Sequence, residues 1–539
     1  MKKMKNFRFY AILMLNIWLF GACELDRFPE TDLSDASFWG SEDNFKKACN
    51  VFYISIDGQA IFFDDLRTDF GYNTPNGAND VSSGTRITPA TSSDWDANYQ
   101  IIFDANNIIE NAVGKEDIES IERWIGEAKF FRAYAYFDLI SKFGDVPLVL
   151  NVLDVDSPEL NNPRVGRESV IDQIYEDLDY AAANVPSIAE LPTTDYGRVS
   201  KNAALTFKAR VALYEGTRQK FHDYGDFSSN LNIAINAAEK AMAEENELYT
   251  EKSYFYIFQE DGEGVANKEN IFSVVYGVND SQTIRSHNIT GLIQNGWYCV
   301  TRPMVELYLC TDGLPIDKSP LAEDPEISYM SIFKNKDPRM DFSLFKEGDP
   351  SNNPDIWDPN VKQNVVTGFS ARKFYNPNNW QRGSSYIDIP VIRYAEVLLI
   401  YAEAKFEMDG SISDLDLDKS INLLRDRVGM PHLTNSFVLS NGLDMRTEIR
   451  RERSVELAQE GFRYNDIIRW KIAEVVLPNE MVGANYFTEM GPRNVSSDGY
   501  LLAQPASTRS FDSSKDYLYP IPTREISLSG NAIIQNPGW

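Results

Sequence analysis

The sequence predicts an all-α protein of tetratricopeptide-like helix pairs, with long irregular loops and a few short β-strands. Three observations support this fold class. Apolar residues recur every three or four positions over many helix-length stretches. The segments between these stretches are rich in Gly, Asn, Ser, Pro and aromatic residues, and strand-like runs are short and few. With 539 residues, 43% of them hydrophobic, the chain can bury a large core.

The strongest periodic segment predicts a helix over residues 117–143, ended by Gly144. Its apolar residues fall on one broad face, and similar patterns predict eight more helices. Helix pairs of this length, with small residues at their contacts, resemble tetratricopeptide units. The other predicted helices cover residues 44–63, 94–113, 168–183, 201–218, 231–243, 394–408, 415–427 and 447–470.

Four long irregular stretches separate these helices. Insertions of this length in a compact domain usually carry function or are disordered. We therefore expect the ligand-side loops among them, with short strands at 271–276 and 388–392. The four stretches are residues 64–93, 279–301, 343–389 and 478–517.

The charge balance excludes several classes of partner. Lys and Arg number 52 against 80 Asp and Glu, a formal net charge of -28. Nucleic acids and anionic lipid surfaces need clustered cations, so neither is expected as a partner. Four cysteines cannot form a disulfide scaffold in so long a chain, and the pairing of Cys49, Cys299 and Cys310 is left open.

No motif indicates a cofactor, a metal or an enzyme. The three histidines are far apart, and there is no HExxH, GxSxG or phosphate-loop pattern. Acidic residues at 414, 416 and 418 begin like a calcium loop, but Lys419 and Arg425 stand where that loop needs Gly and Glu. Calcium binding is therefore possible but unsupported by spacing, and no catalytic residue is predicted.

The first 23 residues predict a secretory signal. A basic start precedes the largely apolar run 9–20, and Gly21-Ala22 stands directly before Cys23. This pattern predicts removal of residues 1–22 and lipidation of Cys23; an ordinary signal followed by a chance cysteine is the alternative. A lipid on Cys23 would hold the chain at a membrane without a spanning helix.

Four segments resemble one family. Residues 127–149 read EAKFFRAYAYFDLISKFGDVPLV, and the segments 389–405, 449–470 and 519–539 also match its motifs in the expected order. With Cys23, they make the chain similar to the SusD/RagB-like outer-membrane nutrient-binding lipoproteins.

The resemblance implies a cell-surface lipoprotein, anchored in the outer membrane and facing outward. Such proteins carry four tetratricopeptide-like helix pairs, capture oligosaccharides or polysaccharides, and pass them to a TonB-dependent SusC-like transporter; they are not enzymes. On this basis residues 23–225 form an N-terminal helical region, 226–280 a connecting helix and strand, and 281–539 a C-terminal region with ligand-side loops and further helices.

One Arg- and Glu-rich segment allows two interpretations. Glu452, Glu456 and Glu460 share one helical face, and paired carboxylates could perform glycosidic acid–base chemistry. Arginines interleave with them, however, and such pairs stabilise helices and lower carboxyl pKa values, the wrong direction for a general acid. We expect salt bridges from Arg450, Arg451, Arg453 and Arg463.

The loop aromatics are the candidate ligand contacts. The C–H face of a sugar packs on a flat ring, and its hydroxyls need Asp, Asn, Gln or Arg. The alternative for any one loop tryptophan is that it only packs the loop. The family's sugar-contacting Trp and Asn lie at the same spacing near the start of the helix at 94–113. The resemblance therefore supports Trp95 and Asn98 as ligand contacts. The predicted ligand-binding residues are Trp95, Asn98, Asp69, Arg86, Trp297, Tyr298, Trp357 and Trp380.

The prediction is therefore a glycan-capturing surface lipoprotein. We expect Trp95→Ala to abolish binding with little change in melting temperature, whereas a large loss of stability would identify Trp95 as core. Two alternatives stay open: a helical-repeat lid of the transporter with little sugar affinity, and a carrier of peptide or glycopeptide. The sequence does not name the glycan.

Overall fold

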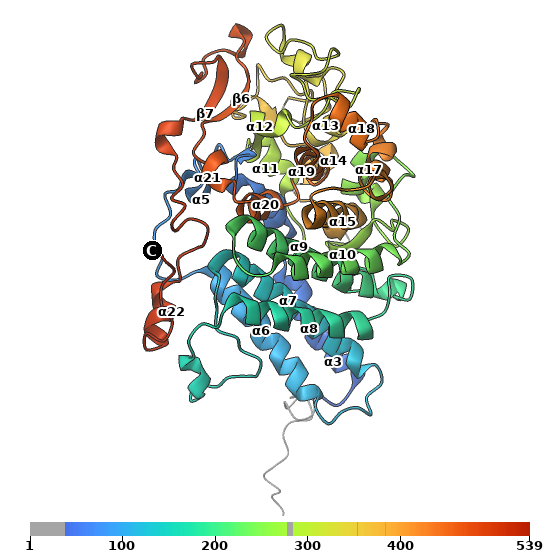
Figure 1. The fold of residues 1–539 in the computed structure, drawn as a ribbon, viewed down its shortest axis with the longest axis vertical. Helices are drawn as coiled ribbons and strands as arrows, with labels where there is room; N and C mark the ends of the chain where they lie inside the picture. Colours follow the sequence, from blue (N-terminus) through green and yellow to red (C-terminus); the bar gives the residue numbers. More distant parts are fainter. Residues whose placement is uncertain (1–37, 278–283, 353, 383) are drawn as a thin grey trace, which may run out of the picture.

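The computed structural model is helical, as predicted, with three small sheets (Figure 1). It describes residues 38–277, 284–352, 354–382 and 384–539. The signal segment and Cys23 lie outside the described residues. No helix of the described part is long and apolar enough to cross a membrane.

The N-terminal half is a stack of helices in which each packs on the next along the chain, from α6 to α10, and α10 packs on α15. This arrangement confirms the predicted helical-repeat architecture, because each pair buries its apolar face against its neighbours. These helices are α3 (Glu42–Ser55), α6 (Ser93–Ala112), α7 (Ile121–Phe143), α8 (Arg167–Asn184), α9 (Lys201–His222), α10 (Phe227–Met242) and α15 (Tyr394–Asp409).

The C-terminal helices are shorter, and two predictions about them are wrong. The segment 415–427, predicted as one helix, is broken at Lys419 and Ser420. The segment 447–470, predicted as one helix, forms two helices separated by a turn. Gln459 and Gly461 have φ values of 63° and 78° in this turn, and a Cβ on Gly461 would lie 2.8 Å from the Ile61 carbonyl oxygen. These helices are α16 (Asp414–Asp418), α17 (Ile421–Val428), α18 (Asn435–Ser440), α19 (Met445–Glu456), α20 (Arg463–Arg469), α21 (Ala473–Val476) and α22 (Thr523–Leu528).

The three sheets within the described residues are all antiparallel. The order β1-β3-β4 joins segments far apart in sequence, and β2 pairs with β5, close to the two predicted strands. The strands are β1 (Gly71–Tyr72), β2 (Asn270–Val274), β3 (Cys299–Val300), β4 (Phe369–Ser370), β5 (Ile389–Arg393), β6 (Met481–Asn485) and β7 (Tyr500–Gln504).

Short helical segments order the long loops. Each spans only one or two turns, which agrees with the Gly-, Asn- and Pro-rich composition of these loops. The prediction of one helix over 44–63 is wrong, because the helix is broken at Ile56 and Asp57. The α-helical ones are α4 (Gly58–Phe63), α5 (Asp80–Ser83), α11 (Ile289–Gln294), α12 (Arg302–Val305), α13 (Pro338–Ser343) and α14 (Pro377–Arg382). The 3₁₀ segments are η1 (Asp64–Arg67), η2 (Pro158–Asn161), η3 (Thr193–Asp195), η4 (Tyr254–Phe258), η5 (Glu260–Gly262), η6 (Tyr329–Phe333), η7 (Thr488–Met490) and η8 (Ala506–Thr508).

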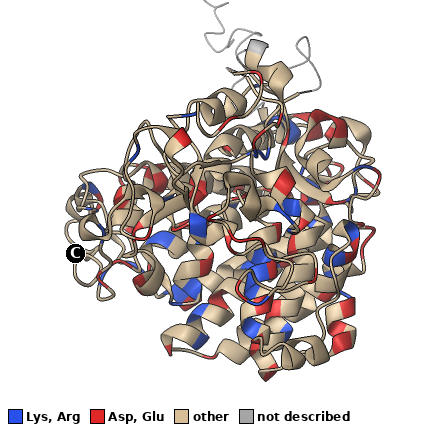
Figure 2. Ribbon diagram, turned by 90° about the horizontal axis from the view of Figure 1, so that it is seen from above, with Lys and Arg blue, Asp and Glu red and all other residues tan. Residues whose placement is uncertain are grey.

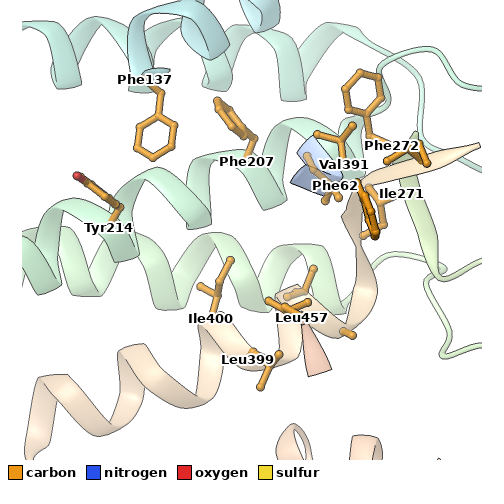
Figure 3. Packing of buried hydrophobic residues seen from close by; sticks show 14 of the residues in the cluster. Phe62, Phe137, Phe207, Tyr214, Ile271, Phe272, Val391, Leu399, Ile400 and Leu457 are labelled. Atoms are coloured by element: carbon orange, nitrogen blue, oxygen red, sulfur yellow. The ribbon is translucent and has the colours of Figure 1, made fainter. Parts of the chain in front are cut away.

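One hydrophobic core joins the two halves of the chain (Figure 3). Phe137 of α7 packs edge-on against Phe207 of α9, with ring centroids 5.7 Å apart. Val391 of β5 and Ile400 of α15 extend the same core into the C-terminal half. The three described cysteines, Cys49, Cys299 and Cys310, are buried and unpaired.

Glu452 and Glu456 of α19, with Glu460 in the turn after it, lie in a buried ion-pair network, as the salt-bridge interpretation predicted, but with other partners. Arg393 binds Glu456 and Glu460 at 2.8 and 2.6 Å, and Arg339 binds Glu452 at 2.6 Å. Further ion pairs join Arg425 to Glu452, Arg427 and Arg339 to Glu456, and Lys373 to Glu460.

The prediction that Arg450, Arg451, Arg453 and Arg463 pair with these glutamates is wrong. Arg453 binds Asp466, Arg463 binds Asp69, and Arg451 binds Glu448, while Arg450 lies over the ring of Trp470. These arginines point elsewhere because residues adjacent in sequence project from different sides of a helix. The glutamates therefore meet arginines of α13, β5 and α17, which no spacing along α19 indicates.

The ion pairs decide the charge state of the glutamates. Burial alone would raise the pKa of Glu456, but Arg427, Arg393 and Arg339 hold it well below its usual range. The pKa of Glu452 is also lowered, by Arg339 and Arg425 against the effect of burial. Neither carboxyl carries a proton at neutral pH, so neither can act as a general acid.

A second carboxyl pair, half-buried Glu263 and buried Asp388, has no cationic partner among the described residues. The Asp388 amide donates to Glu263 Oε1 at 2.7 Å, and Tyr196 Oη donates to Asp388 Oδ2 at 3.2 Å. Burial, together with the charge of Asp388, raises the pKa of Glu263 to about 9, and burial raises the pKa of Asp388 as well. The folded state therefore prefers a protonated carboxyl here.

We expect Glu263→Gln to stabilise the protein at alkaline pH. A carboxyl whose pKa is raised on folding stabilises the fold below its unfolded pKa, and that contribution is lost as the pH rises through the folded value. Between about pH 5 and pH 9 the wild type should lose about 1–3 kcal/mol that the variant keeps. Urea unfolding across this range measures the difference; an equal slope in both proteins would contradict it. Glu159→Gln, at an exposed residue, is the control.

Candidate ligand-binding site

An open groove of about 420 Å³ lies between α6, the loop after α7 and the C-terminal end of the chain. In Figure 1 α22 lies beside that loop at the lower left. The volume of the groove is within the range of small-ligand sites, about 300–1,000 Å³. We call it the α6 groove; it is lined by Trp95, Asp96, Tyr99, Gln100, Ile102, Phe103, Pro147, Val149, Asn151, Leu153, Glu159, Leu160, Asn162, Glu525 and Ile533.

Helix α6 presents a row of aromatic rings to the groove. The Ser92 hydroxyl caps the helix by accepting from the Trp95 amide at 3.4 Å. From there Trp95, Tyr99 and Phe103 recur every four residues, so their side chains lie on one helical face. The rings of Trp95 and Tyr99 are 5.1 Å apart, and exposure increases along the row, from 4% at Trp95 to 42% at Phe103.

Polar groups surround this row. Gln100, Asn151, Glu159 and Asn162 are exposed lining residues, and they offer amide and carboxylate groups to a ligand. The side chains of Asn151, Glu159 and Asn162 are not engaged by any other side chain of the described part of the chain. Arg524, beside the groove, pairs with Asp96 and Glu525.

Chemically, the groove can hold a ligand that has both an apolar face and hydroxyl groups. Aromatic rings pack against C–H faces, while amides and carboxylates bond hydroxyls around the edge. The Tyr99 hydroxyl is already used, since it donates to the Pro147 carbonyl oxygen at 2.8 Å. Tyr99 therefore offers its ring rather than its hydroxyl.

The structure places Trp95 and Asn98 near the start of α6, where both side chains are buried. Trp95 lines the groove while its ring packs edge-on against Phe143 at 5.1 Å. Asn98 is buried and does not line the groove; its amide donates to the Asp94 carbonyl oxygen and to Asp138 Oδ2, at 2.7 and 2.6 Å. The expectation that Asn98 bonds sugar hydroxyls does not fit this position.

Asp69 and Arg86 also have internal partners. Asp69 forms a two-point ion pair with Arg463, at 2.9 and 2.8 Å. Arg86 donates to the Asp516 carbonyl oxygen at 2.7 Å and lies over the ring of Tyr519. Both are buried because the loop 64–93 folds back against the C-terminal segment, which the loop's own composition does not show.

The remaining predicted aromatics lie outside the groove. Trp357 is fully buried and stacked on Phe345 with centroids 4.7 Å apart, and Tyr298 is buried too; both are core residues, so the expectation that they face a ligand is wrong. Trp297 and Trp380 are partly buried, in the turn before β3 and on α14. The structure therefore does not gather the predicted tryptophans into one site.

Tyr99 and Phe103 are the aromatic groove residues that the sequence prediction missed, and the polar lining residues Gln100, Asn151, Glu159 and Asn162 were missed as well. The spacing of the two aromatic residues, four and eight from Trp95, was a usable signal, because it places the three rings on one helical face. No local signal indicates that the loop 147–162 and residues 525–533 close the groove.

The fold is that of a helical-repeat protein, and comparisons with known proteins identify its family. The model of the SusD family matches residues 268–539, just over half of the chain. A second model, described as "Starch-binding associating with outer membrane", matches residues 62–213. The chain belongs to the SusD family.

Individual relatives agree over nearly the whole chain. SusD-like protein P2 of Formosa agariphila is 26% identical, covering 99% of this chain and all of the relative. A crystal structure of a SusD-like carbohydrate binding protein from Bacteroides fragilis is 26% identical with a TM-score of 0.75, covering 91% of this chain and 99% of that one. A laminarin binding SusD-like protein, 20% identical with a TM-score of 0.60 and covering 93% and 100% of the two chains, shares the fold.

Proposed function

We propose that this protein captures a glycan in the α6 groove. The observation that carries the proposal is the row of Trp95, Tyr99 and Phe103, which opens to solvent at Phe103 among exposed amide side chains. Membership of the SusD family, and the carbohydrate binding named for a relative, support it. Binding in an open groove with few hydrogen bonds gives micromolar to millimolar affinity, about -4 to -8 kcal/mol.

The groove favours an uncharged glycan. Asp96, Glu159 and Glu525 line it, and the neighbouring Arg524 is already paired with two of them. Acidic and basic residues are interspersed over the molecule (Figure 2). A sulfated or uronate-rich chain would meet these carboxylates without an unpaired cation, so like-charge repulsion disfavours it.

The proposal extends to the cell surface. Lipidation of Cys23 would anchor the chain in the outer membrane facing outward, and the bound glycan would pass to a TonB-dependent SusC-like transporter. Catalysis is not part of the proposal, because Arg and Lys side chains bind the carboxylates of Glu452, Glu456 and Glu460.

We expect Phe103→Ala to weaken glycan binding about two- to tenfold. The exposed ring contributes stacking worth about 0.5–1.5 kcal/mol, and little folding stability depends on it. Isothermal titration against a panel of neutral polysaccharides, with thermal melts alongside, measures both effects. Val113→Ala, which also truncates an exposed apolar residue near the end of α6, is the matched control.

Two results would contradict the proposal. Unchanged affinity in Phe103→Ala would place the glycan elsewhere, for example at Trp297. Absence of heat with every glycan would favour the transporter lid, or a peptide carrier, over a glycan-binding protein.

A further inference from the structure

A second cavity, separate from the α6 groove, lies on the other side of the first turn of α6. Its volume is about 280 Å³, and it is bounded by α4, α7, α9 and the turn before α20. Asp94 lines this cavity, whereas the next residue, Trp95, lines the groove. We call it the Tyr134 cleft; its polar lining includes Asp64, Arg67, Tyr134, Asp138, Lys142, Arg210 and Asn465.

Aromatic side chains form the apolar part of the cleft. Phe137 and Phe207 come from the facing helices α7 and α9, with Val391 of β5 nearby (Figure 3). The ring of Tyr134 is stacked on Phe207, with centroids 5.2 Å apart and an interplanar angle of 24°. The cleft therefore offers apolar surface to one side of a ligand.

The charges of the cleft balance within the protein. Arg67 binds Asp64 at 2.7 Å, and Lys142 binds Asp138 and Asp94 at 3.0 and 3.2 Å. Arg210 binds Glu396, outside the cleft, at 2.6 Å. Because each of these cations already has a carboxylate partner, the lining favours neither an anion nor a cation.

Several polar atoms that line the cleft nevertheless remain available to hydrogen-bond a ligand. Asp64 and Asp138 use only Oδ2 in their bonds to other side chains, and they are 30% and 33% exposed. Within the described residues, neither the Tyr134 hydroxyl nor the Asn465 amide is bonded to another side chain. Burial raises the pKa of Tyr134 to about 12, so its hydroxyl keeps its proton and can donate. The cleft thus has both acceptors and donors available.

We propose that the Tyr134 cleft binds a small, neutral, polyhydroxylated molecule, a monosaccharide or disaccharide. Such a ligand places C–H groups against the aromatic rings and hydroxyls against Asp64, Asp138, Tyr134 and Asn465. The site is independent of the α6 groove, because its lining residues differ. Its volume of about 280 Å³ is close to the lower limit of small-ligand sites, about 300 Å³, which suits one or two sugar units.

The cleft can be blocked without disturbing its ion pairs. Ala60 is exposed on α4 and lines the cleft, so Ala60→Trp fills it from the solvent side. Asn465→Leu, at a partly buried residue, removes a donor and an acceptor while keeping the number and branching of the side-chain heavy atoms. Val113→Ala, at an exposed residue that lines neither the cleft nor the groove, is the control, and Phe103→Ala reports on the groove. Melting temperatures establish that each variant is folded.

Ligand-observed NMR with glucose, galactose, mannose, xylose, N-acetylglucosamine and maltose tests the proposal. At least one of these probes should bind the wild type, and both cleft variants should bind it at least about tenfold more weakly. Val113→Ala should bind it unchanged. Failure of all six probes to bind, or wild-type affinity in Ala60→Trp, would overturn the proposal. Loss of binding only in Phe103→Ala would assign small sugars to the groove instead.

Discussion

Glu456→Ala is expected to lower the free energy of unfolding by about 3–5 kcal/mol, because it breaks a buried ion-pair network on one side only. Arg427, Arg393 and Arg339 meet the Glu456 carboxylate at 2.6, 2.8 and 3.0 Å. Without it, three buried guanidinium groups lose a shared counter-charge. Uncompensated buried charge is costly, whereas an intact buried pair adds little net stability.

Chemical denaturation of the purified protein measures this loss. Glu176→Ala, which removes an exposed carboxylate from α8, is the matched control and should change stability by less than about 0.5 kcal/mol. If the two variants were equally stable, the network would not hold α13, β5, α17 and α19 together.

Trp95→Ala is expected to cost about 3–5 kcal/mol of folding stability and to abolish glycan binding in the groove. The indole is 4% exposed and packs between Tyr99 and Phe143, so truncation leaves a cavity at the start of α6. This expectation replaces the one drawn from sequence, in which Trp95 was an exposed residue whose loss leaves the melting temperature nearly unchanged.

Thermal melts and glycan titration of the same samples separate the two effects. Trp95→Phe, which keeps an aromatic ring, should recover most of the stability and part of the affinity. A stable Trp95→Ala protein would show that the ring is not a core residue, and full affinity in that protein would exclude the groove as the glycan site.

Much of the fold was predictable because helix formation has a local signal. The periodic segment at 117–143 corresponds to α7, and the helix predicted at 201–218 lies within α9. The prediction of one helix over 447–470 was wrong, because the close approach of the Ile61 backbone requires a turn at Gly461. That contact joins residues far apart in sequence, so no local pattern indicates it.

The site was less predictable, because residue type does not determine exposure. Asp69 and Arg86 look like sugar contacts in a polar loop, yet Arg463 and Asp516 bind them inside the protein. Trp357 stands among Asn, Pro and Asp residues and is nevertheless fully buried against Phe345. In each case the deciding partner lies on a distant segment.

The sequence by itself determined the helical class, the family and the acidic charge balance of this protein, because periodicity, motifs and composition are properties of the chain. Only the tertiary structure decided which aromatic rings meet solvent, which arginines neutralise the α19 glutamates, and how α6 separates the groove from the cleft. The physical reason is that burial and ion pairing depend on contacts between segments hundreds of residues apart, such as α6 with the segment around α22.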